Sequence, residues 1–263
     1  YHGVYFSIQA LRMYHEICNT SGVEFVVIDN NPDSQHGKLV EKFIETQVPN
    51  GRYIRYTKKK STSVRNQVFL EARGDVTLCM DCHVMIEPNG LDQLLEYFED
   101  DDNQQHLVSG PLWYDNLNNV STHFKPIWQS YMFGVWDTDP RYHAGRPFEI
   151  PMNGLGLFAC KTDHWPGFSN YFIGFGGEEW YIHEKFRKFG GKAVCLPSLK
   201  WIHRFGRPGG ASYPNTYEDR VFNYYIGWLE LYKDPTHEKI MSITQHFSNV
   251  MSIKKLERIK TNA

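Results

Sequence analysis

The chain has 263 residues, of which 41% are hydrophobic and 22% are charged, as in ordinary globular proteins. Its formal net charge of −2 excludes a global electrostatic field that would attract nucleic acid or an anionic membrane surface. No apolar run approaches about 18–20 residues, so we expect no membrane span.

Helix and strand patterns alternate through the first hundred residues. Helical periodicity is found at 4–18, 39–46, 61–72 and 89–99, and strand-like runs at 23–28, 52–56 and 76–80. This alternation predicts an α/β fold with a mostly parallel, doubly wound sheet and helices on both faces. Because the chain opens on a helix, whereas a nucleotide-binding half usually begins with a strand, we expect that a first strand is missing from this sequence.

The pattern changes after residue 100. Strands are predicted at 107–113 and 192–196, an apolar run at 152–160, a helix at 178–189, an irregular or hairpin insert at 113–150, a Gly/Pro-rich loop at 204–215 and a mostly helical end at 218–260. We therefore expect a catalytic domain over 1–215 and a C-terminal helical extension over 216–263. The domain divides into a nucleotide-binding half, about 1–100, and an acceptor and metal half, about 101–215. The loop at 204–215 is a candidate lid.

Five cysteines are scattered along the chain, partly within apolar runs: Cys18, Cys79, Cys82, Cys160 and Cys195. An odd, scattered set favours free thiols in a reducing compartment, so we expect a cytoplasmic protein, and we recognise no signal peptide. Cys79 and Cys82 form a C-x-x-C pair without a second pair, which favours a structural role over a zinc or redox site. The basic clusters at 52–60 and 254–260 are typical of solvated surface, so we expect no nucleic-acid patch.

Potential metal ligands follow the strand predicted at 76–80. Asp81 and His83 are separated by one residue, which places both side chains on the same side of the strand end. A carboxylate with an imidazole suits Mn²⁺ or Zn²⁺ better than Ca²⁺. A turn with a capping Asp and a hydrogen-bonded His is the structural alternative.

Five sequence blocks stand in a fixed order along the chain, at 28–34, 65–75, 81–83, 152–159 and 176–191. In content and order they resemble the GT-A glycosyltransferases of the family 2 type, and more specifically the polypeptide N-acetylgalactosaminyltransferases. The similarity covers about residues 4–233. It implies a GT-A fold in which Asp81, His83 and His203 hold Mn²⁺ or Mg²⁺. For His203, packing beside Trp201 remains the alternative.

The resemblance also implies contacts to a nucleoside diphosphate sugar. Candidate donor-binding residues are Asp29, Asn30, Arg65, Asn66, Gly154 and Gly156, and Arg204 and Arg207 in the candidate lid could clamp the diphosphate. Asx residues are also common turn formers, and the arginines could be solvated surface residues.

Glu178 and Glu179 follow Gly176-Gly177 at the start of a predicted helix. Acids in a first turn can simply match the helix dipole. In inverting relatives the second acid is the general base, and in the retaining relatives named above that position is Asn. We expect Glu178 to contact the acceptor or donor sugar and Glu179 to be the base if the enzyme inverts; the stereochemistry stays open.

Together these features predict transfer of a hexose or N-acetylhexosamine, with UDP as the foremost nucleotide, to a hydroxyl on a glycan, a protein or a modified nucleobase. A nucleotidyltransferase of the same fold class and a degenerate carbohydrate-binding domain are the rival interpretations.

Overall fold

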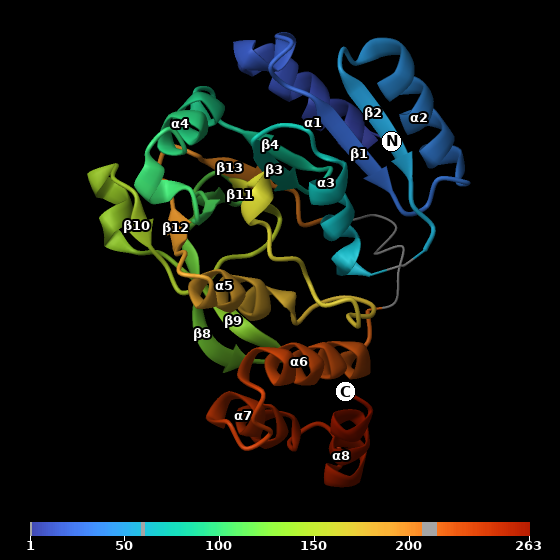
Figure 1. Cartoon of the computed structure of the whole chain (residues 1–263), viewed down its shortest axis with the longest axis vertical. Coiled ribbons are helices and arrows are strands. Elements are labelled where there is room, and N and C mark those ends of the chain that lie inside the picture. The colour runs from blue at the N-terminus through green and yellow to red at the C-terminus, as the bar shows by residue number, and fades with distance from the viewer. Residues whose placement is uncertain (1, 59–60, 207–214) are drawn as a thin grey trace.

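The computed structural model describes residues 2–58, 61–206 and 215–263 (Figure 1). These residues form an α/β fold whose N-terminal helices and strands lie at one end and whose last three helices lie at the other. Within the described ranges, no helix combines the length and the apolar character that crossing a membrane requires.

The N-terminal layer is built from two strands and two helices. They are α1 (His2–Tyr14), β1 (Phe25–Asp29), α2 (Gln35–Gln47) and β2 (Gly51–Arg55). β1 and β2 pair in parallel, with Phe25 opposite Gly51. Ser34 caps α2, because its hydroxyl accepts a hydrogen bond from the Gly37 N–H at 2.9 Å. The apolar faces of both helices join one core, to which Ile8 and Phe43 belong.

A five-stranded sheet in the order β10-β12-β5-β11-β3 forms the centre. Its strands are β3 (Val76–Met80), β5 (Leu107–Ser109), β10 (Phe148–Glu149), β11 (Leu157–Lys161) and β12 (Ala193–Cys195). β12 is parallel to β5, and β11 is antiparallel to both β3 and β5. The prediction of an α/β fold is confirmed, and the sheet is mixed. β11 can run antiparallel because no crossover helix precedes it; the chain reaches it from β10 through residues 150–156.

A smaller sheet in the order β4-β13-β6-β7 continues from the first. Its strands are β4 (Val84–Ile86), β6 (Leu112–Trp113), β7 (Val120–Ser121) and β13 (Trp201–His203). The single strand predicted at 107–113 is two strands, β5 and β6, which belong to different sheets on either side of Gly110-Pro111. β13 was not predicted, and it matters for the site because its last residue is His203.

The remaining elements surround these sheets. The helices are α3 (Arg65–Glu71), α4 (Gly90–Tyr97), α5 (Glu178–Lys188), α6 (Tyr217–Tyr232), α7 (Glu238–Phe247) and α8 (Ile253–Asn262), and the insert contains the hairpin β8 (His123–Gln129) and β9 (Met132–Asp137). Short 3₁₀ turns occur at Glu16–Asn19, Thr62–Val64, Asp101–Asn103, Pro140–Ala144 and Thr162–His164.

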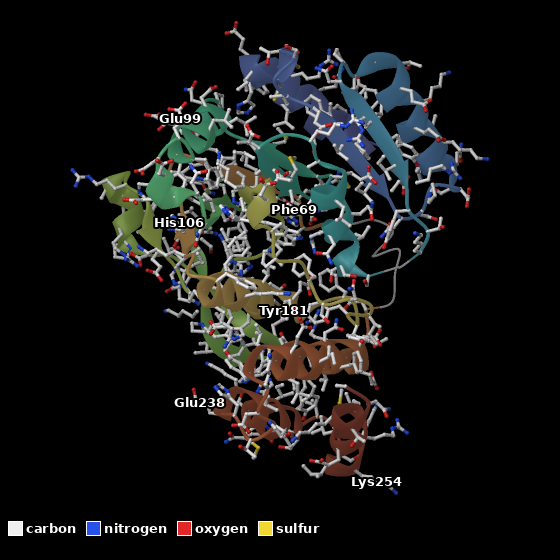
Figure 2. All side chains as sticks on the ribbon, viewed as in Figure 1. Phe69, Glu99, His106, Tyr181, Glu238 and Lys254 are labelled. Atoms are coloured by element: carbon white, nitrogen blue, oxygen red, sulfur yellow. The ribbon has the colours of Figure 1, made fainter. Side chains whose placement is uncertain are left out.

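The C-terminal helices share a core with the rest of the molecule. Side chains fill the space between α5 and α6, where Tyr181 is fully buried (Figure 2). Trp228 of α6 and Phe247 of α7 belong to the same cluster, together with Phe133 of the hairpin. This packing fixes α6 against the first turn of α5. The domain boundary at residue 215 stays a prediction.

Candidate active site

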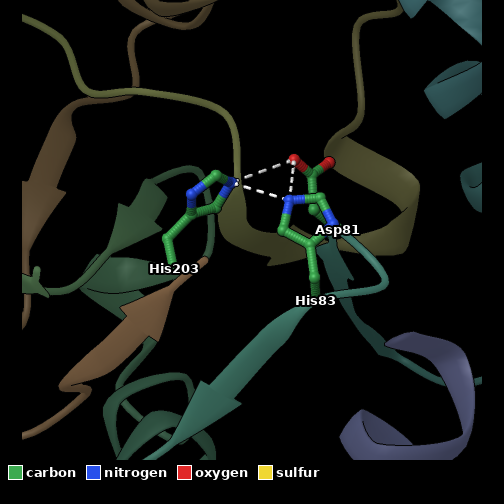
Figure 3. Close-up of side chains that lie close together, drawn as sticks. All are labelled: Asp81, His83 and His203. Carbon is green, nitrogen blue, oxygen red and sulfur yellow. Dashed lines mark hydrogen bonds and ion pairs between the residues drawn. The ribbon is translucent and has the colours of Figure 1, made fainter. Parts of the chain in front are cut away.

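Three side chains from two segments of the chain converge at the end of β3. Asp81 follows β3, His83 precedes β4, and His203 ends β13, where it pairs with Val84. Their ligand atoms face one another (Figure 3). The Nε2 atoms of His83 and His203 are 3.0 Å apart, and Asp81 Oδ2 lies 3.4 Å from the His203 Nε2 and 3.7 Å from the His83 Nε2.

This spacing fits a divalent cation. Ligand bonds of about 2.0–2.1 Å separate neighbouring ligand atoms by about 2.9 Å in an octahedron and about 3.4 Å in a tetrahedron. Two of the observed separations, 3.0 and 3.4 Å, lie within this range, and the third, 3.7 Å, is slightly longer. Two imidazoles with one carboxylate suit a borderline metal such as Mn²⁺ or Zn²⁺. The predicted ligands are therefore placed together in a metal-compatible group.

Gly156 lies directly against two members of the metal group, His203 and Asp81. A Cβ at this position would lie 3.0 Å from the His203 Cδ2 and 3.0 Å from the Trp201 ring. The Gly156 carbonyl also accepts the Asp81 N–H at 2.8 Å. The other predicted glycine, Gly154, packs against Trp136, whose ring would be 2.8 Å from an added Cβ. The contact of either glycine with a donor sugar stays a prediction.

Arg65 links the metal group to the acidic start of α5. Its Nη2 lies 3.2 Å from the Asp81 Oδ1, and its Nη1 lies 3.4 Å from the Glu178 Oε1. Burial alone would raise the pKa of Asp81, but the hydrogen bond from His203 and the charge of Arg65 outweigh it and lower the pKa to about 2. Asp81 is thus ionised and ready to bind a cation.

Glu178 is almost completely enclosed. Its side chain is 2% exposed, and its Oε2 has no hydrogen-bond partner among the described residues. A buried carboxylate oxygen without a donor is costly, so this atom calls for a partner that the described residues do not supply; a contact of Glu178 with a sugar stays a prediction. Helix-dipole matching alone does not explain such a placement.

Glu179 is half-buried beside Glu178. Burial, followed by the negative charge of Glu178, raises its pKa from 4.5 to about 7. A carboxyl group with a pKa near neutrality can accept a proton at physiological pH and release it again. This property fits the base that the sequence pattern predicted.

A buried histidine holds the first turn of α5 in place. The His183 Nε2 accepts the Asn153 N–H at 3.0 Å, so its Nδ1–H donates to the Glu179 carbonyl at 2.6 Å. Burial lowers the pKa of His183 to about 3, which keeps the ring neutral. Neither His183 nor Asn153 was identified from the sequence as a residue of the site.

Asn223 of α6 fixes the glycine turn that precedes α5. Its side-chain amide donates to the carbonyls of Ile173 (2.7 Å) and Gly176 (2.8 Å), and its Oδ1 accepts the Ile173 N–H at 2.9 Å. Gly176 and Gly177 have φ values of +92° and +95°, which glycine adopts readily. The turn and α6 together set the position of both glutamates.

Two of the predicted nucleotide-binding residues, Asp29 and Asn30, lie at the end of β1 and directly after it. Asp29 ends β1, where its carboxylate accepts the Asn31 N–H at 2.7 Å and the Tyr53 hydroxyl at 2.6 Å. Asn30 lines a cavity of about 1490 Å³ that extends to Arg65 and to the metal group. Asn30 and Arg65 thus line one open space, whereas Asp29 is not part of its lining; the binding of a donor by these residues stays a prediction.

The side chain of Asn66 forms hydrogen bonds to the loop at 165–168. Its amide donates to the Phe168 carbonyl at 3.1 Å, and its Oδ1 accepts the Phe168 N–H at 2.7 Å and the Trp165 indole N–H at 3.1 Å. The side chain therefore anchors the loop at 165–168. Arg204 is exposed, and its N–H reaches the His83 carbonyl at 3.4 Å. Arg207 and most of the candidate lid lie outside the described residues.

The fold and the convergent Asp–His–His group define an α/β protein with a candidate divalent-metal centre at the carboxyl end of β3. Residues 7–150 match the family described as Glycosyl transferase family 2, and this match spans more than half of the chain. The chain belongs to this family. Comparison with curated protein sequences finds no match.

Solved structures of the same fold include the following three. GalNAc-T7 with UDP, GalNAc and Mn²⁺ has a TM-score of 0.68 at 16% identity, covering 91% of this chain and 47% of that one. The Pyrobaculum calidifontis mannosyltransferase PcManGT with GDP-Man and Mn²⁺ has a TM-score of 0.57 at 13% identity, with coverages of 99% and 75%. S. aureus TarS 1–349 with UDP-GlcNAc has a TM-score of 0.54 at 14% identity, with coverages of 94% and 70%.

These likenesses confirm the GT-A fold, and the resemblance to the N-acetylgalactosaminyltransferases is confirmed at this level. The chain spans about half the length of the GalNAc-T7 chain that it matches.

Proposed function

We propose that the chain is a metal-dependent glycosyltransferase that moves a hexose or N-acetylhexosamine from a nucleoside diphosphate sugar, with UDP the foremost nucleotide, to a hydroxyl acceptor. The convergence of Asp81, His83 and His203 beside the Arg65-linked carboxylates carries this proposal. Family membership supports it, and so do the similar structures in complex with UDP, GalNAc and Mn²⁺, with GDP-Man and Mn²⁺, or with UDP-GlcNAc.

The metal group would hold Mn²⁺, or Mg²⁺ with lower preference because Mg²⁺ favours all-oxygen ligands. When bound, such an ion supplies Lewis-acid stabilisation of the diphosphate leaving group. The chain itself supplies an ionised Asp81 and, at Arg65, a guanidinium that orients Asp81 and Glu178 towards the same space. Asp29 and Asn30 would bind the nucleoside, and Arg204 with Arg207 would clamp the diphosphate.

Glu179 is the proposed base. A pKa near 7 leaves a large fraction of this carboxylate able to take the acceptor hydroxyl proton at physiological pH. Glu178, linked to Arg65, would bind the donor or acceptor sugar through its free Oε2. A carboxylate base at the start of α5 supports inversion of the anomeric centre.

Aromatic side chains near the acidic turn support an acceptor site on that side. Tyr131 of the insert stacks on Tyr217 of α6 with ring centroids 3.6 Å apart, and Tyr217 is 47% exposed. Exposed aromatic faces bind sugar rings and nucleobases alike. The acceptor proposed here is a hydroxyl on a glycan, a protein or a modified nucleobase. The five free cysteines fit a reducing compartment such as the cytoplasm.

The test is a donor screen on the purified chain with Mn²⁺, Mg²⁺ or EDTA, in which released UDP, GDP or TDP is measured. We expect metal-dependent release with one donor class, and at least a hundredfold loss in Asp81→Asn. The matched control is Asp115→Asn, an exposed loop carboxylate. Metal-dependent release of pyrophosphate from a nucleoside triphosphate would favour a nucleotidyltransferase. Sugar binding without any turnover would favour a degenerate carbohydrate-binding domain.

A further inference from the structure

Two arginines from different helices approach the acidic turn, which we define as residues 176–179. Arg65 of α3 lies 3.4 Å from the Glu178 carboxylate and 3.2 Å from that of Asp81, so its charge is shared with the metal group. Arg220 of α6 reaches the same turn at its glycines. The turn therefore carries two carboxylates, Glu178 and Glu179, and meets two cations.

The guanidinium of Arg220 lies directly against Gly176. A Cβ at Gly176 would clash with the Arg220 Nε and would lie 3.0 Å from its Cζ and 3.1 Å from its Nη2. Any residue other than glycine would therefore displace either the guanidinium or the turn. Glycine at this position allows a φ of +92° and also leaves room for the cation.

The packing of α6 fixes this contact. The Asn223 amide donates to the Gly176 carbonyl at 2.8 Å. A Cβ at Gly177 would lie 3.3 Å from the Arg220 carbonyl oxygen and 3.3 Å from the Tyr224 nitrogen. Positions 220, 223 and 224 share one face of a helix, so this face of α6 lies against the turn. The position of the guanidinium is thus set by a packed helix.

The guanidinium of Arg220 has only weak hydrogen-bond partners. Among the described residues, the acceptors that it reaches are neutral: the Tyr131 carbonyl at 3.4 Å from Nη1 and the Asn215 Oδ1 at 3.5 Å from Nη2. Its Nε is buried and has no partner among them. Hydrogen bonds of this length are weak, so the positive charge is left to act on the nearby carboxylates.

Glu179 is one of these carboxylates. The charged and titratable groups that face it in the described chain are Glu178 beside it, Arg65 of α3, and Arg220 with Tyr224 of α6. Burial raises the pKa of the Tyr224 hydroxyl, so this group is neutral. Burial and then the charge of Glu178 raise the pKa of Glu179 to about 7, and the charge of Arg220 opposes this rise more than that of Arg65 does.

We propose that Arg220 is a positioning residue for the proposed base: α6 holds its guanidinium over Gly176, where its charge keeps the Glu179 carboxylate ionised beside Glu178. Gly176 is glycine because this cation occupies the space of a side chain. Arg65 does not replace Arg220, because Arg65 is already shared with the metal group. The inference rests on the proposed role of Glu179 in the reaction, but the coupling of the two charges is measurable without turnover.

Loss of Arg220 should make Glu179 harder to ionise. A nearby opposite charge lowers the pKa of a carboxyl group by about 1–3 pH units, and Arg220 is partly exposed, so we expect Arg220→Met to raise the Glu179 pKa by about one pH unit. The folded chain binds this proton more tightly than the unfolded chain, so the resulting stability is complete below about pH 4.5 and is lost as the pH rises through the folded pKa. In Arg220→Met this loss should occur at higher pH.

The test is urea unfolding between pH 5 and pH 9, in which each protein is compared with its own Glu179→Gln counterpart. The pH midpoint of the stability difference reports the pKa of Glu179 in the folded chain. We expect a midpoint near 7 in the unaltered chain and about one pH unit higher in Arg220→Met. Arg220→Lys keeps the charge and should shift the midpoint by less than half as much. Arg258→Met, which removes an exposed arginine of α8, should leave it unchanged.

Gly176→Ala tests the geometry separately. Its Cβ should push the guanidinium away, so the midpoint should rise as in Arg220→Met, and the two changes together should add little to either alone. Gly177→Ala is the matched control: its φ of +95° imposes similar backbone strain, but the added Cβ meets the Asn223 Cβ at 3.0 Å and not the guanidinium. An unmoved midpoint in Arg220→Met, or equal shifts in the two glycine variants, would overturn the proposal.

Turnover gives a further readout. The acidic limb of the kcat profile should move up by about one pH unit in Arg220→Met and return towards its original position in Arg220→Lys. A loss of kcat that is equal at every pH would assign Arg220 a purely structural role and would contradict the proposal. If no donor is turned over at all, the proposed function fails, and the unfolding midpoints still decide whether Arg220 controls the charge of Glu179.

Discussion

Replacing Glu179 by Gln removes a carboxyl group at the start of α5 whose pKa is raised towards neutrality. The pKa rises from 4.5 to about 7, chiefly through burial and then through the charge of Glu178. One pKa unit corresponds to about 1.4 kcal/mol, so the shift is worth up to about 3 kcal/mol. Because part of the shift comes from the neighbouring charge of Glu178, we expect the measured change in the free energy of unfolding to be about 1–3 kcal/mol.

The direction in which stability changes with pH follows from proton binding by Glu179. The folded chain holds the Glu179 proton more tightly than the unfolded chain, so this contribution to stability is complete below about pH 4.5 and is lost as the pH rises through about 7. Gln does not titrate. The stability of Glu179→Gln relative to the unaltered chain should therefore increase between pH 5 and pH 8 and stay constant above.

The assay is urea unfolding of both proteins at pH 5 and pH 8, with Glu45→Gln on the exposed side of α2 as the control for loss of one charge. A pH-independent difference between Glu179→Gln and the unaltered chain would refute the reasoning. In turnover, the same variant should lose about 10²–10⁴-fold in kcat if Glu179 is the base. Donor binding should change little.

Three further changes probe the surroundings of the site. Arg65→Met leaves Asp81 and the buried Glu178 without their shared cation, so the free energy of unfolding should fall by about 3 kcal/mol in urea titrations; a loss below about 1 kcal/mol would contradict the ion-pair assignment. Asn223→Ala removes three buried hydrogen bonds from the glycine turn and should cost about 2–4 kcal/mol by thermal unfolding, whereas the exposed Asn118→Ala should be neutral. Gly156→Ala should push His203 out of place and weaken Mn²⁺ binding about tenfold by calorimetry, and unchanged affinity would show that Gly156 does not position this ligand.

Much of the site was predictable because several of its polar residues stand at the ends of strands. Asp81 and His83 stand directly after an apolar run, and parallel sheets place such positions at one edge. His203 was harder: its strand, β13, has only three residues, and its position depends on pairing with β4, which is far away in the sequence. The resemblance to a known family supplied that residue.

Other features of the site could not be predicted from local patterns. Asn223 is a buried polar residue whose partners lie on another segment, and His183 pairs with the distant Asn153 as well as with the Glu179 carbonyl of its own helix; the sequence next to Asn223 or Asn153 does not indicate these contacts. Asn66 has a sequence position compatible with donor binding, yet its amide is engaged by the loop at 165–168. The break at Gly110-Pro111 moves β6 into another sheet, a tertiary effect that strand propensity does not report.

The most direct test of the central claim is calorimetric titration of UDP into the purified chain with and without Mn²⁺. The account predicts that Mn²⁺ strengthens UDP binding at least tenfold in the unaltered chain and that His203→Ala abolishes this enhancement. His143→Ala, on an exposed turn of the insert, should keep it. UDP binding that is indifferent to Mn²⁺, or an enhancement that survives His203→Ala, would contradict a metal centre built from Asp81, His83 and His203.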